Sequence, residues 1–434
     1  MIPYKHFLLI TSGILCPLVL AAQNLDWKTA ASYTKKPVKA SLTSRLTSYV
    51  KQDTNTSAEQ LKFAKALLKE LRQYGLSGTQ EKNGLVQVKI PSNIKGNVPE
   101  VVFIARTDAS ATAVSPQIHE NYKGGEITIQ ASPRLALDVY NAPQLTRAYG
   151  HDLLTASGQN TLGTSTKAGA TIAMEIARFL DEHPSVSHGP ITLLFVPGQA
   201  GLKTLLDKKP NTPYIYTLEG TQKGELSNQI FNIQRFDINF EGNRQVALGD
   251  AINSAFADNL LIASDFHSLL PRANRPETTS GDKGFIYVDT IEHTGDHTHI
   301  SGEIQAFSEE EMQRLTAEVT RAFTTVKAMH HKAKDFSLSW KEEQKNLASE
   351  QADQALLLAE KAMQKEEISS KRIPTRIPNS AALLAAGNWP IVTLFTGHYN
   401  DNTQYEYADL DEMEASFRTA MQILTQVSIP EKND

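Results

Sequence analysis

The sequence VVFIAR occupies residues 101–106 and is followed by Thr107 and Asp108. Its first five residues form an unbroken apolar run, which is the pattern of a strand buried on both faces of a sheet. A second apolar run, ITLLFV, occupies residues 191–196. Between the two runs, residues 166–180 mix alanines with larger apolar side chains, as expected for a helix packed on a sheet. Strand, helix and strand in this order predict an α/β domain with a largely parallel sheet.

The segments on either side extend this domain. Ser57 and Gln60 have the spacing of a capping box at the start of an amphipathic helix. Asn83 and Gly84 predict a turn into an alternating strand at residues 85–90. The same domain is expected to resume near the C-terminus with elements at residues 351–365, 391–396 and 410–427.

The composition changes after about Gly224, which predicts a second domain. Residues 230–240 alternate as a half-exposed strand, and Gly295-Asp296 has the pattern of a hairpin turn. Helices are expected at residues 251–270 and 309–327. We therefore expect a smaller α+β domain at residues 223–333, inserted into a larger domain formed by residues 23–222 plus 334–434.

Length and composition narrow the class of protein. The chain has 434 residues, enough for two domains, and its 40% hydrophobic and 21% charged residues are typical of a globular protein. The formal net charge is −5, and no dense basic stripe is present. The sequence therefore gives no support for nucleic-acid binding.

Residues 1–22 have the pattern of a secretory signal peptide. Lys5 and His6 precede an apolar run at residues 7–20, and Ala21-Ala22 supplies small residues for cleavage. The run is short for a membrane span of about 20 residues, so we expect no stable membrane anchor, with a retained anchor as the alternative. The expected location is a periplasm or the external medium. Cleavage would remove Cys16, the only cysteine, and with it any disulfide or thiolate zinc site.

Five segments, in this order, resemble the site segments of the peptidase T family of tripeptide aminopeptidases, a branch of the di-zinc exopeptidases. They are residues 103–110 (FIARTDAS), 160–169 (NTLGTSTKAG), 195–201 (FVPGQAG), 216–220 (YTLEG) and 395–407 (FTGHYNDNTQYEY). The resemblance runs from about residue 46 to about residue 427. It implies a mixed, largely parallel sheet sandwiched by helices, with an inserted domain that serves as a lid or in dimerisation.

The chain departs from the family pattern at the positions where the resemblance implies metal ligands. The residues at those positions are Arg106, Ser165, Ala200, Glu219 and Tyr405, and Gln199 stands at the position of the general base. Zinc requires about three imidazole, thiolate or carboxylate ligands in a catalytic site. Arginine stays protonated and repels a cation, and glutamine cannot accept a proton from water. Only Glu219 could still bind metal, while Asp108 matches a carboxylate that orients a ligand.

Several side chains could instead contact an organic ligand. Arg106 and Asp108 flank Thr107 at a strand end, and two interpretations fit them: an ion pair that fills the former metal pocket, or an anion site at the Arg106 guanidinium. Arg376 matches an arginine that relatives use near substrate. Tyr399 and Asn400 are expected to line the same region.

Three functions remain open from the sequence. The first is a catalytically inactive peptidase T-like protein without a cofactor, which keeps a cleft for short peptides or amino acids. The second is an active zinc aminopeptidase that uses other ligands, for example His151, Asp152, Glu219 and His398. The third is a structural or assembly role, including a homodimer formed through the inserted domain. The residues His293, His297 and His299 also invite a metal interpretation, but solvated histidines are ordinary on a hairpin.

Overall fold

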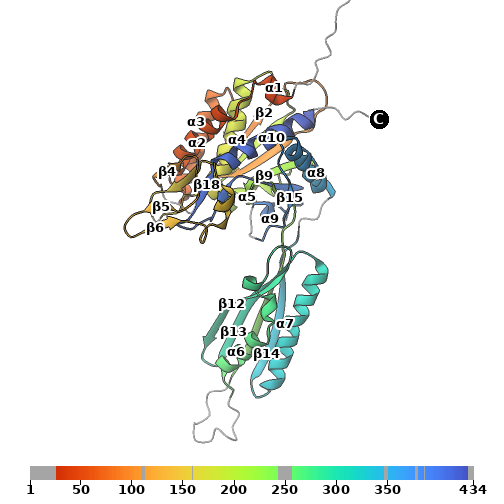
Figure 1. Cartoon of the computed structure of the whole chain (residues 1–434). Coiled ribbons are helices and arrows are strands. Elements are labelled where there is room, and N and C mark those ends of the chain that lie inside the picture. Colours follow the sequence, from red (N-terminus) through yellow and green to blue (C-terminus); the bar gives the residue numbers. More distant parts are fainter. Residues whose placement is uncertain are drawn as a thin grey trace, which may run out of the picture.

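The computed structural model describes residues 26–108, 113–158, 160–242, 257–346, 350–376, 380–385 and 387–428. The predicted signal peptide lies outside these residues. Figure 1 shows a larger domain, which contains the first and last described helices, and a smaller elongated domain below it. None of the described helices combines the length and the apolar character that a membrane span requires.

An eight-stranded sheet organises the larger domain. Its order is β1 (Gly78–Gln80), β2 (Val86–Ile90), β8 (Ile191–Val196), β3 (Val101–Arg106), β9 (Tyr214–Gly220), β16 (Ile391–Phe395), β10 (Glu225–Ser227) and β15 (Lys371–Arg372). The four strands β8, β3, β9 and β16 are parallel to one another, and β8, β3 and β16 are almost wholly buried. The predicted α/β domain with a largely parallel core is confirmed.

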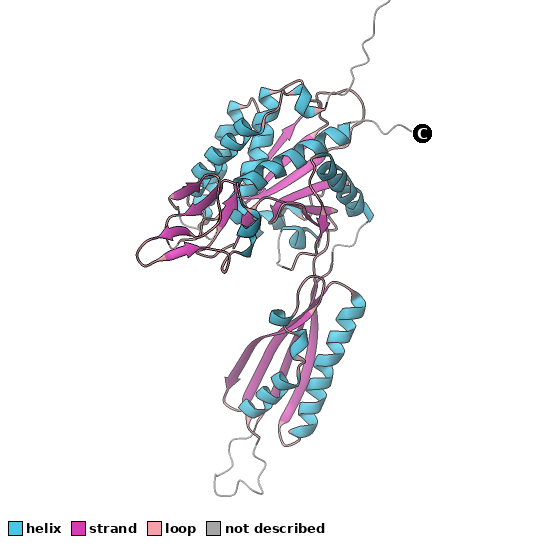
Figure 2. Cartoon of the chain, in the orientation of Figure 1, coloured by secondary structure: helices cyan, strands magenta, loops and turns pink. Residues whose placement is uncertain are grey.

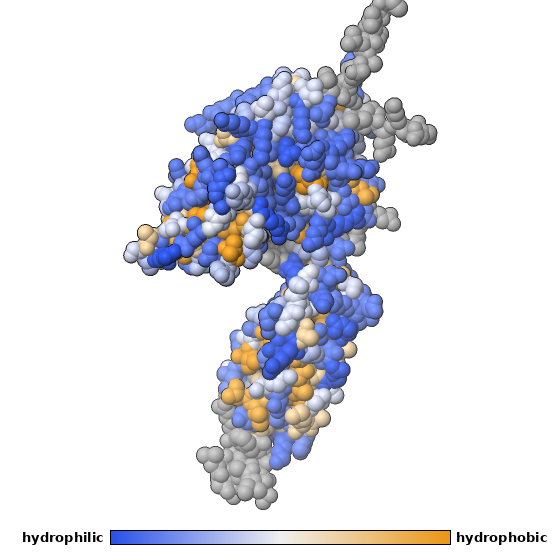
Figure 3. Space-filling view, viewed as in Figure 1, coloured by the Kyte–Doolittle hydropathy of each residue, from blue (hydrophilic) through white to orange (hydrophobic). Residues whose placement is uncertain are grey.

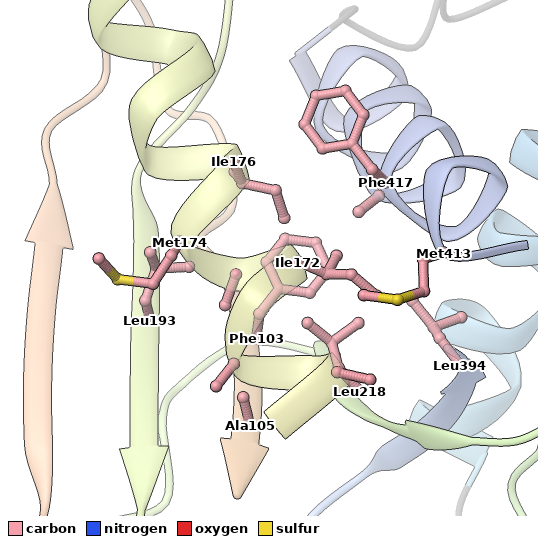
Figure 4. Packing of buried hydrophobic residues seen from close by; sticks show 14 of the residues in the cluster. Phe103, Ala105, Ile172, Met174, Ile176, Leu193, Leu218, Leu394, Met413 and Phe417 are labelled. Carbon is pink, nitrogen blue, oxygen red and sulfur yellow. The ribbon is translucent and has the colours of Figure 1, made fainter. Parts of the chain in front are cut away.

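Helices cover both faces of this sheet. One face carries α2 (Lys35–Val50), α4 (Thr164–Glu182), α8 (Glu350–Lys365) and α10 (Leu410–Ser428), with α1 (Trp27–Ala30) and α3 (Ser57–Gln73) beside them. The other face carries α5 (Gly198–Leu205) and α9 (Ser380–Ala385). Figure 4 shows Phe103, Ile172 and Met413 meeting in the core between the sheet, α4 and α10.

Close packing brings the start of α4 to the end of β9. A Cβ atom at Gly169 would overlap the carbonyl oxygen of Leu218, so only glycine allows this approach. Glu219 directly follows Leu218, and it lines one cavity together with Ser165 and Thr166 of the first turn of α4.

Short strands form a second layer beside the larger sheet. They make a sheet in the order β17 (His398–Tyr399), β18 (Tyr407–Asp409), β7 (Leu153–Ala156) and β4 (Pro116–His119), and a hairpin of β5 (Ile127–Gln130) and β6 (Leu135–Leu137), followed by the short helix η1 (Pro143–Arg147).

The smaller domain has its own sheet and its own core. The strand order is β12 (Phe285–Thr294), β13 (His297–Ala306), β11 (Asn232–Glu241) and β14 (Lys334–Gln344), all antiparallel. The helices α6 (Asn259–Leu269) and α7 (Glu309–Met329) pack on this sheet, and η2 (Arg272–Asn274) and η3 (Pro276–Thr278) follow α6. Figure 2 shows the two helices beside the strands of this domain.

The smaller sheet does not span the interval predicted for the inserted domain, residues 223–333. At the start, β10 pairs with β16 of the larger sheet. At the end, β14 pairs with β11, so the smaller sheet continues to Gln344. Phe336, Leu338 and Trp340 alternate along β14 and pack against the core of the smaller domain, which is a strand signal that the sequence analysis did not use.

The cap of α3 also differs from the prediction. The N-cap is Thr56, not Ser57, and Glu59 completes the capping box by accepting a hydrogen bond from the backbone amide of Thr56. The predicted capping box is therefore one residue too late, because Ser57-x-x-Gln60 and Thr56-x-x-Glu59 both have the capping-box spacing.

Candidate ligand-binding site

A cavity of about 400 Å³ lies at the edge of the larger sheet where the carboxyl ends of β3 and β9 meet the first turn of α4. Open α/β sheets bind their ligands at this edge. The cavity is lined by Arg106, Asp108, Ser165, Thr166, Glu219, Gly220, Thr221, Glu225, Leu226, Ser227, Ile373, Pro374, Thr375, Arg376, Thr393, His398, Asp401 and Asn402.

Arg106 and Asp108 form an ion pair inside this cavity. The side chain of Thr107 between them is buried, and Arg106 Nε donates to Asp108 Oδ1 at 2.9 Å. A second contact joins Arg106 Nη2 to Asp108 Oδ2, so the pairing is bidentate. Burial opposes the charge on Arg106, but the hydrogen bond that Arg106 donates to Asp108 and the negative charges of Asp108 and Glu219 outweigh burial and raise the guanidinium pKa. Of the two interpretations given above, the structure contains the ion pair.

Glu219, at the end of β9, carries a partly unsatisfied carboxyl group. Its Oε2 accepts a hydrogen bond from the backbone amide of Ser380 at 3.0 Å. Its Oε1 is buried and has no hydrogen-bond partner among the described residues. Burial raises the pKa of Glu219, although Arg106 lowers it in part.

His398 supplies a second internal cation. The hydroxyl of Thr396 donates to the carbonyl oxygen of Gly220 at 2.9 Å, so the hydroxyl oxygen accepts from His398 Nδ1 at 2.6 Å. On the other side of the ring, His398 Nε2 lies 3.2 Å from Asp401 Oδ2. Burial lowers the pKa of His398, but Asp401 and neighbouring glutamates outweigh burial and raise it. The protonated imidazolium fits these contacts, because it carries a hydrogen on both nitrogens.

Glu406 holds the start of α4. Its carboxylate accepts from the backbone amides of Gly163 at 2.8 Å, Thr164 at 2.6 Å and Ser165 at 3.1 Å, and from the Thr164 hydroxyl at 2.8 Å. Helix N-termini carry unpaired amide groups and a positive dipole, so a buried carboxylate is stabilised there. This anion-binding end of α4 is thus occupied by the protein itself.

The structure brings some of the predicted site residues together and separates others. Arg106, Asp108, Ser165, Glu219 and Arg376 line the cavity. The described residues Gln199, Ala200, Tyr399, Asn400 and Tyr405 do not.

The separated residues have other environments. Gln199 and Ala200 are exposed in the first turn of α5. Tyr399 stacks on a neighbouring tyrosine ring and its hydroxyl donates to Glu412, and the Asn400 side chain donates to two backbone carbonyls. Tyr405 packs against a peripheral apolar cluster. The prediction that Gln199, Ala200 and Tyr405 surround the cavity is wrong.

Several lining residues were not expected from the sequence, and three of them, Asp401, Asn402 and Glu225, carry a carboxylate or an amide. Asp401 and Asn402, rather than Tyr405, face the cavity from the segment that follows β17. Positive φ angles at Asn400 and Asn402 turn this segment sharply, and its register could not be read from spacing alone. Glu225 and Asp401 therefore add two carboxylates to Asp108 and Glu219, the two that the sequence predicted for this site.

Arg376 connects the two domains. It donates to the carbonyl oxygens of Gly281 at 3.2 Å and Lys283 at 2.9 Å and to Thr279 Oγ1 at 2.9 Å. Its guanidinium also lies 5.4 and 5.1 Å from the ring centres of two phenylalanines, Phe231 and Phe285. Arg376 therefore lines the cavity, but the N–H groups of its guanidinium donate hydrogen bonds to acceptors of the smaller domain.

The side chains at this site do not fit a zinc ion. Within the described part of the chain, no three histidine, cysteine, aspartate or glutamate side chains converge as metal ligands. Two of the residues considered as alternative zinc ligands form ion pairs instead. His151 pairs with Asp409 at 2.6 Å, and Asp152 pairs with Lys39 at 2.6 Å. At the cavity itself, the fixed charge of Arg106 opposes a divalent cation.

The three histidines of the β12–β13 hairpin also have separate partners. His293 Nδ1 lies 3.0 Å from Thr298 Oγ1. His297 pairs with Glu241 at 2.9 Å, and His299 with Asp237 at 3.4 Å. They do not share a common centre.

No family model matches the chain, but curated relatives do. A peptidase T of Halothermothrix orenii is 31% identical over 409 residues, which cover 89% of this chain and 98% of the relative. A peptidase T of Bacillus subtilis is 29% identical over 411 residues, which cover 90% of this chain and 99% of the relative.

Solved structures show the same fold. The aminopeptidase PepT of Bacillus cereus matches with a TM-score of 0.71 and 17% identity, over 90% of this chain and 99% of that structure. A tripeptidase of Staphylococcus aureus matches with a TM-score of 0.70 and 14% identity, over 90% and 98% of the two chains.

Proposed function

The chain belongs to the peptidase T family, and from that premise we propose that it is an exported member that binds short peptides or amino acids without hydrolysing them. The bidentate pair of Arg106 and Asp108 is the observation that carries this proposal. A zinc-dependent peptidase needs a metal-bound water and a base that removes its proton. At the cavity, a permanent cation instead neutralises one of the carboxylates.

Other residues support the loss of hydrolysis. Ser165 offers only a neutral hydroxyl at the cavity wall. Gln199, at the position that corresponds to the base by resemblance, is exposed and cannot act as a general base. The described cavity also retains the volume and the mixed polar and apolar wall that small-molecule sites use.

Export and the lack of a bound metal belong to the same proposal. The sequence feature that supports export is the apolar run at residues 7–20 before Ala21-Ala22. N-terminal sequencing of protein recovered from the periplasm or medium should begin near Gln23. An intact Met1, or firm retention in the membrane fraction, would contradict this part.

An active zinc aminopeptidase is the second candidate. Its support is the 31% identity to a protein named peptidase T over nearly the full length of both chains. A third function, in assembly, would rest on the smaller domain alone.

The decisive experiment combines metal content with catalysis. The purified mature protein is loaded with zinc, dialysed, and measured for bound zinc and for hydrolysis of trialanine, with a peptidase T as positive control. We expect no stoichiometric zinc and no hydrolysis that a chelator abolishes. About one zinc per chain, with activity lost on chelation and regained with metal, would establish the aminopeptidase instead.

A further inference from the structure

The solvent-facing side of α3 carries a row of four basic residues, which we call the α3 basic row. Lys62, Lys65, Lys69 and Arg72 follow one another at spacings of three, four and three residues, and all four side chains are exposed. At about 100° per residue they fall within about 80° of the helix circumference, over about 15 Å of its length. Two or three other residues separate successive members, so the sequence itself shows no dense basic run.

The acidic residues of α3 do not compensate this row, because both are engaged elsewhere. The carboxylate of Glu59 accepts from the backbone amide of Thr56 at 3.1 Å in the capping box. The carboxylate of Glu70 accepts from Arg45 Nε at 2.8 Å and from the Tyr49 hydroxyl at 2.8 Å. Within the part of the chain that the structure describes, no member of the row forms an ion pair.

Two other helices pair their basic residues with acidic residues one turn away. Arg314 on α7 lies 3.4 Å from Glu311, and Arg418 on α10 lies 3.0 Å from Glu414. In the α3 basic row, each member instead has another basic residue as its neighbour one turn away. Like charges at this spacing destabilise a helix. The row therefore lowers the stability of the protein on its own.

The row is also not needed to form α3. The helix is fixed by its capping box and by side chains such as Phe63, Leu67 and Leu71, which are buried in the core. The helix dipole favours basic residues only in the last turn, whereas Lys62 and Lys65 lie about two or three turns from that end. A local arrangement that costs stability without helping the fold is typical of a functional surface.

We propose that the α3 basic row binds the surface of a bilayer that contains anionic lipids. Figure 1 shows α3 on the outside of the larger domain, so a flat, negatively charged surface can contact all four side chains at once. The signal peptide expected at residues 1–22 would carry the chain across a membrane, so a bilayer is the anionic surface that it meets first. The inference is independent of what the cavity binds, because no residue of α3 lines the cavity.

The expected binding is peripheral and reversible. Each lysine or arginine near an anionic bilayer strengthens binding by about fivefold. The attraction weakens with salt, because the Debye length falls from about 10 Å at about 0.1 M salt to about 3 Å at about 1 M. A high-salt wash should therefore release the protein, in contrast to the firm retention that an uncleaved signal peptide would give.

Vesicle sedimentation of the mature protein, which begins at Gln23, tests the row without a contribution from the signal peptide. The vesicles contain phosphatidylglycerol and phosphatidylcholine in equal amounts, or phosphatidylcholine alone. We expect binding to the first kind only, and release at about 1 M salt. In Lys62→Gln/Lys65→Gln/Lys69→Gln, the partition coefficient should fall by at least about tenfold. Lys62→Arg/Lys65→Arg/Lys69→Arg keeps the charges and should bind as the unaltered protein does.

A matched control separates the row from the net charge of the protein. Lys203→Gln/Lys327→Gln/Lys334→Gln removes three exposed lysines from α5 and the smaller domain, and it should bind as the unaltered protein does. Melting curves show whether each variant is folded. Removing like charges from α3 should leave the melting temperature unchanged or higher, so a loss of binding in that variant would not reflect unfolding.

Three outcomes would overturn the proposal. The first is equal binding to the two kinds of vesicle, and the second is an equal loss of binding in the α3 glutamine variant and in the control. The third is retention of the unaltered protein by a short duplex DNA but by neither kind of vesicle, which would assign the row to a nucleic acid. None of these outcomes bears on peptide binding or on the loss of hydrolysis, which the zinc and trialanine experiment addresses.

Discussion

Arg106 and His398 bring two positive charges into a cavity that would otherwise be strongly acidic. Four carboxylate residues line the cavity, and the Arg106–Asp108 and His398–Asp401 pairs each neutralise one of them. Because a guanidinium cannot lose its proton in a protein, the charge at Arg106 is present at every pH at which the protein is folded. The cavity can therefore remain intact without a cation from solution.

Replacing Arg106 should lower the stability of the protein. In Arg106→Met, Asp108 and Glu219 would lose their nearest compensating charge, and the free energy of unfolding should fall. The pair is partly exposed, with 26% and 19% of the two side chains accessible, so we expect a loss of about 1–3 kcal/mol rather than the larger cost of a fully buried pair.

Urea denaturation measures this loss, and Arg106→Met/Asp108→Asn provides the control. Removing the unpaired carboxylate should restore part of the stability, since the remaining buried charge is smaller. Equal stability of Arg106→Met and the unaltered protein would show that the pair does not hold the cavity.

Glu412 makes stability depend on pH. Burial, with a smaller contribution from Asp409, raises the pKa of this carboxyl to about 7. In the unfolded chain it titrates near its ordinary value of about 4.3. Its folded-state pKa is raised, so the protonated form is favoured, and stability is lost as pH rises from about 4.5 through about 7.

Glu412→Gln should remove that loss. Oε2 of Glu412 accepts from the Tyr399 hydroxyl at 2.6 Å and the Lys223 amide at 3.0 Å, and a glutamine oxygen can accept both bonds. The free energy of unfolding of the variant, relative to that of the unaltered protein, should therefore be higher at pH 8.5 than at pH 5 by on the order of 2 kcal/mol. Urea denaturation at the two pH values measures the gain. The exposed Glu120→Gln should show none, and a pH-independent difference for Glu412→Gln would refute the assignment.

At the scale of secondary-structure elements, α4 depends on a cap from a distant part of the chain. Glu406, which is only 1% exposed, accepts three backbone amides and one hydroxyl at the start of this helix. The N-cap residue, Gly163, makes no side-chain hydrogen bond of its own. The cap is therefore supplied by the loop before β18, and it ties that loop to the cavity wall.

Glu406→Ala should destabilise the protein more than loss of an ordinary cap. It would leave several buried amides unpaired, so we expect a loss of about 2–4 kcal/mol, because each buried unpaired group costs about 1–3 kcal/mol and an ordinary cap about 1 kcal/mol. Ser308→Ala, which removes the exposed cap of α7, is the matched control. Both are measured by urea denaturation, and equal losses would contradict the special role of Glu406.

The predictable elements are those whose signal lies within one segment. The strands β3 and β8 were predicted because an unbroken apolar run is itself the signature of a buried parallel strand. The side chains at the end of β3, Arg106 and Asp108, were placed correctly for the same reason. Local patterns also predicted the smaller domain, and family resemblance added the helices on both faces of the sheet.

The missed features depend on contacts between distant segments. Glu406 caps a helix whose start lies more than 200 residues earlier, and no local sequence pattern predicts this contact. Asp401 and Asn402 reach the cavity because of a turn whose geometry depends on two asparagines with positive φ. Spacing predicted which segment faces the cavity but not which of its side chains.

At the scale of the whole molecule, Arg376 lies where the two domains meet. Its loop belongs to the larger domain, its donors bind Thr279, Gly281 and Lys283 of the smaller domain, and its side chain lines the cavity. A movement of the smaller domain would therefore displace Arg376 at the cavity wall. The same domain leaves one of its own edges uncovered.

That edge is formed by β12, one of the two outer strands of the smaller sheet, together with α6, which packs against it. Five large apolar side chains on these two elements are exposed: Leu260, Leu261, Leu269, Tyr287 and Ile291. Figure 3 shows apolar surface over the part of the smaller domain where Figure 1 places β12 and α6. Exposed edge strands and apolar patches are surfaces on which proteins associate.

We propose that a second copy of the chain covers this edge, so that the protein is a homodimer in solution. An edge strand is self-complementary, because its free amide and carbonyl groups can pair with those of the same strand related by a twofold axis. Leu261→Glu and Ile291→Glu would each place a charge in the interface. Each should weaken the dimer at least tenfold, which corresponds to about 1.4 kcal/mol.

Sedimentation equilibrium at several protein concentrations measures the association. Leu357→Glu is the matched control, because Leu357 is 50% exposed on α8 of the larger domain, away from this edge. The control should associate as the unaltered protein does, since its charge stays in water. A single-chain mass for the unaltered protein at 100 micromolar, about the upper range of such measurements, would exclude the dimer. A dimer that persists in both edge variants would place the interface elsewhere.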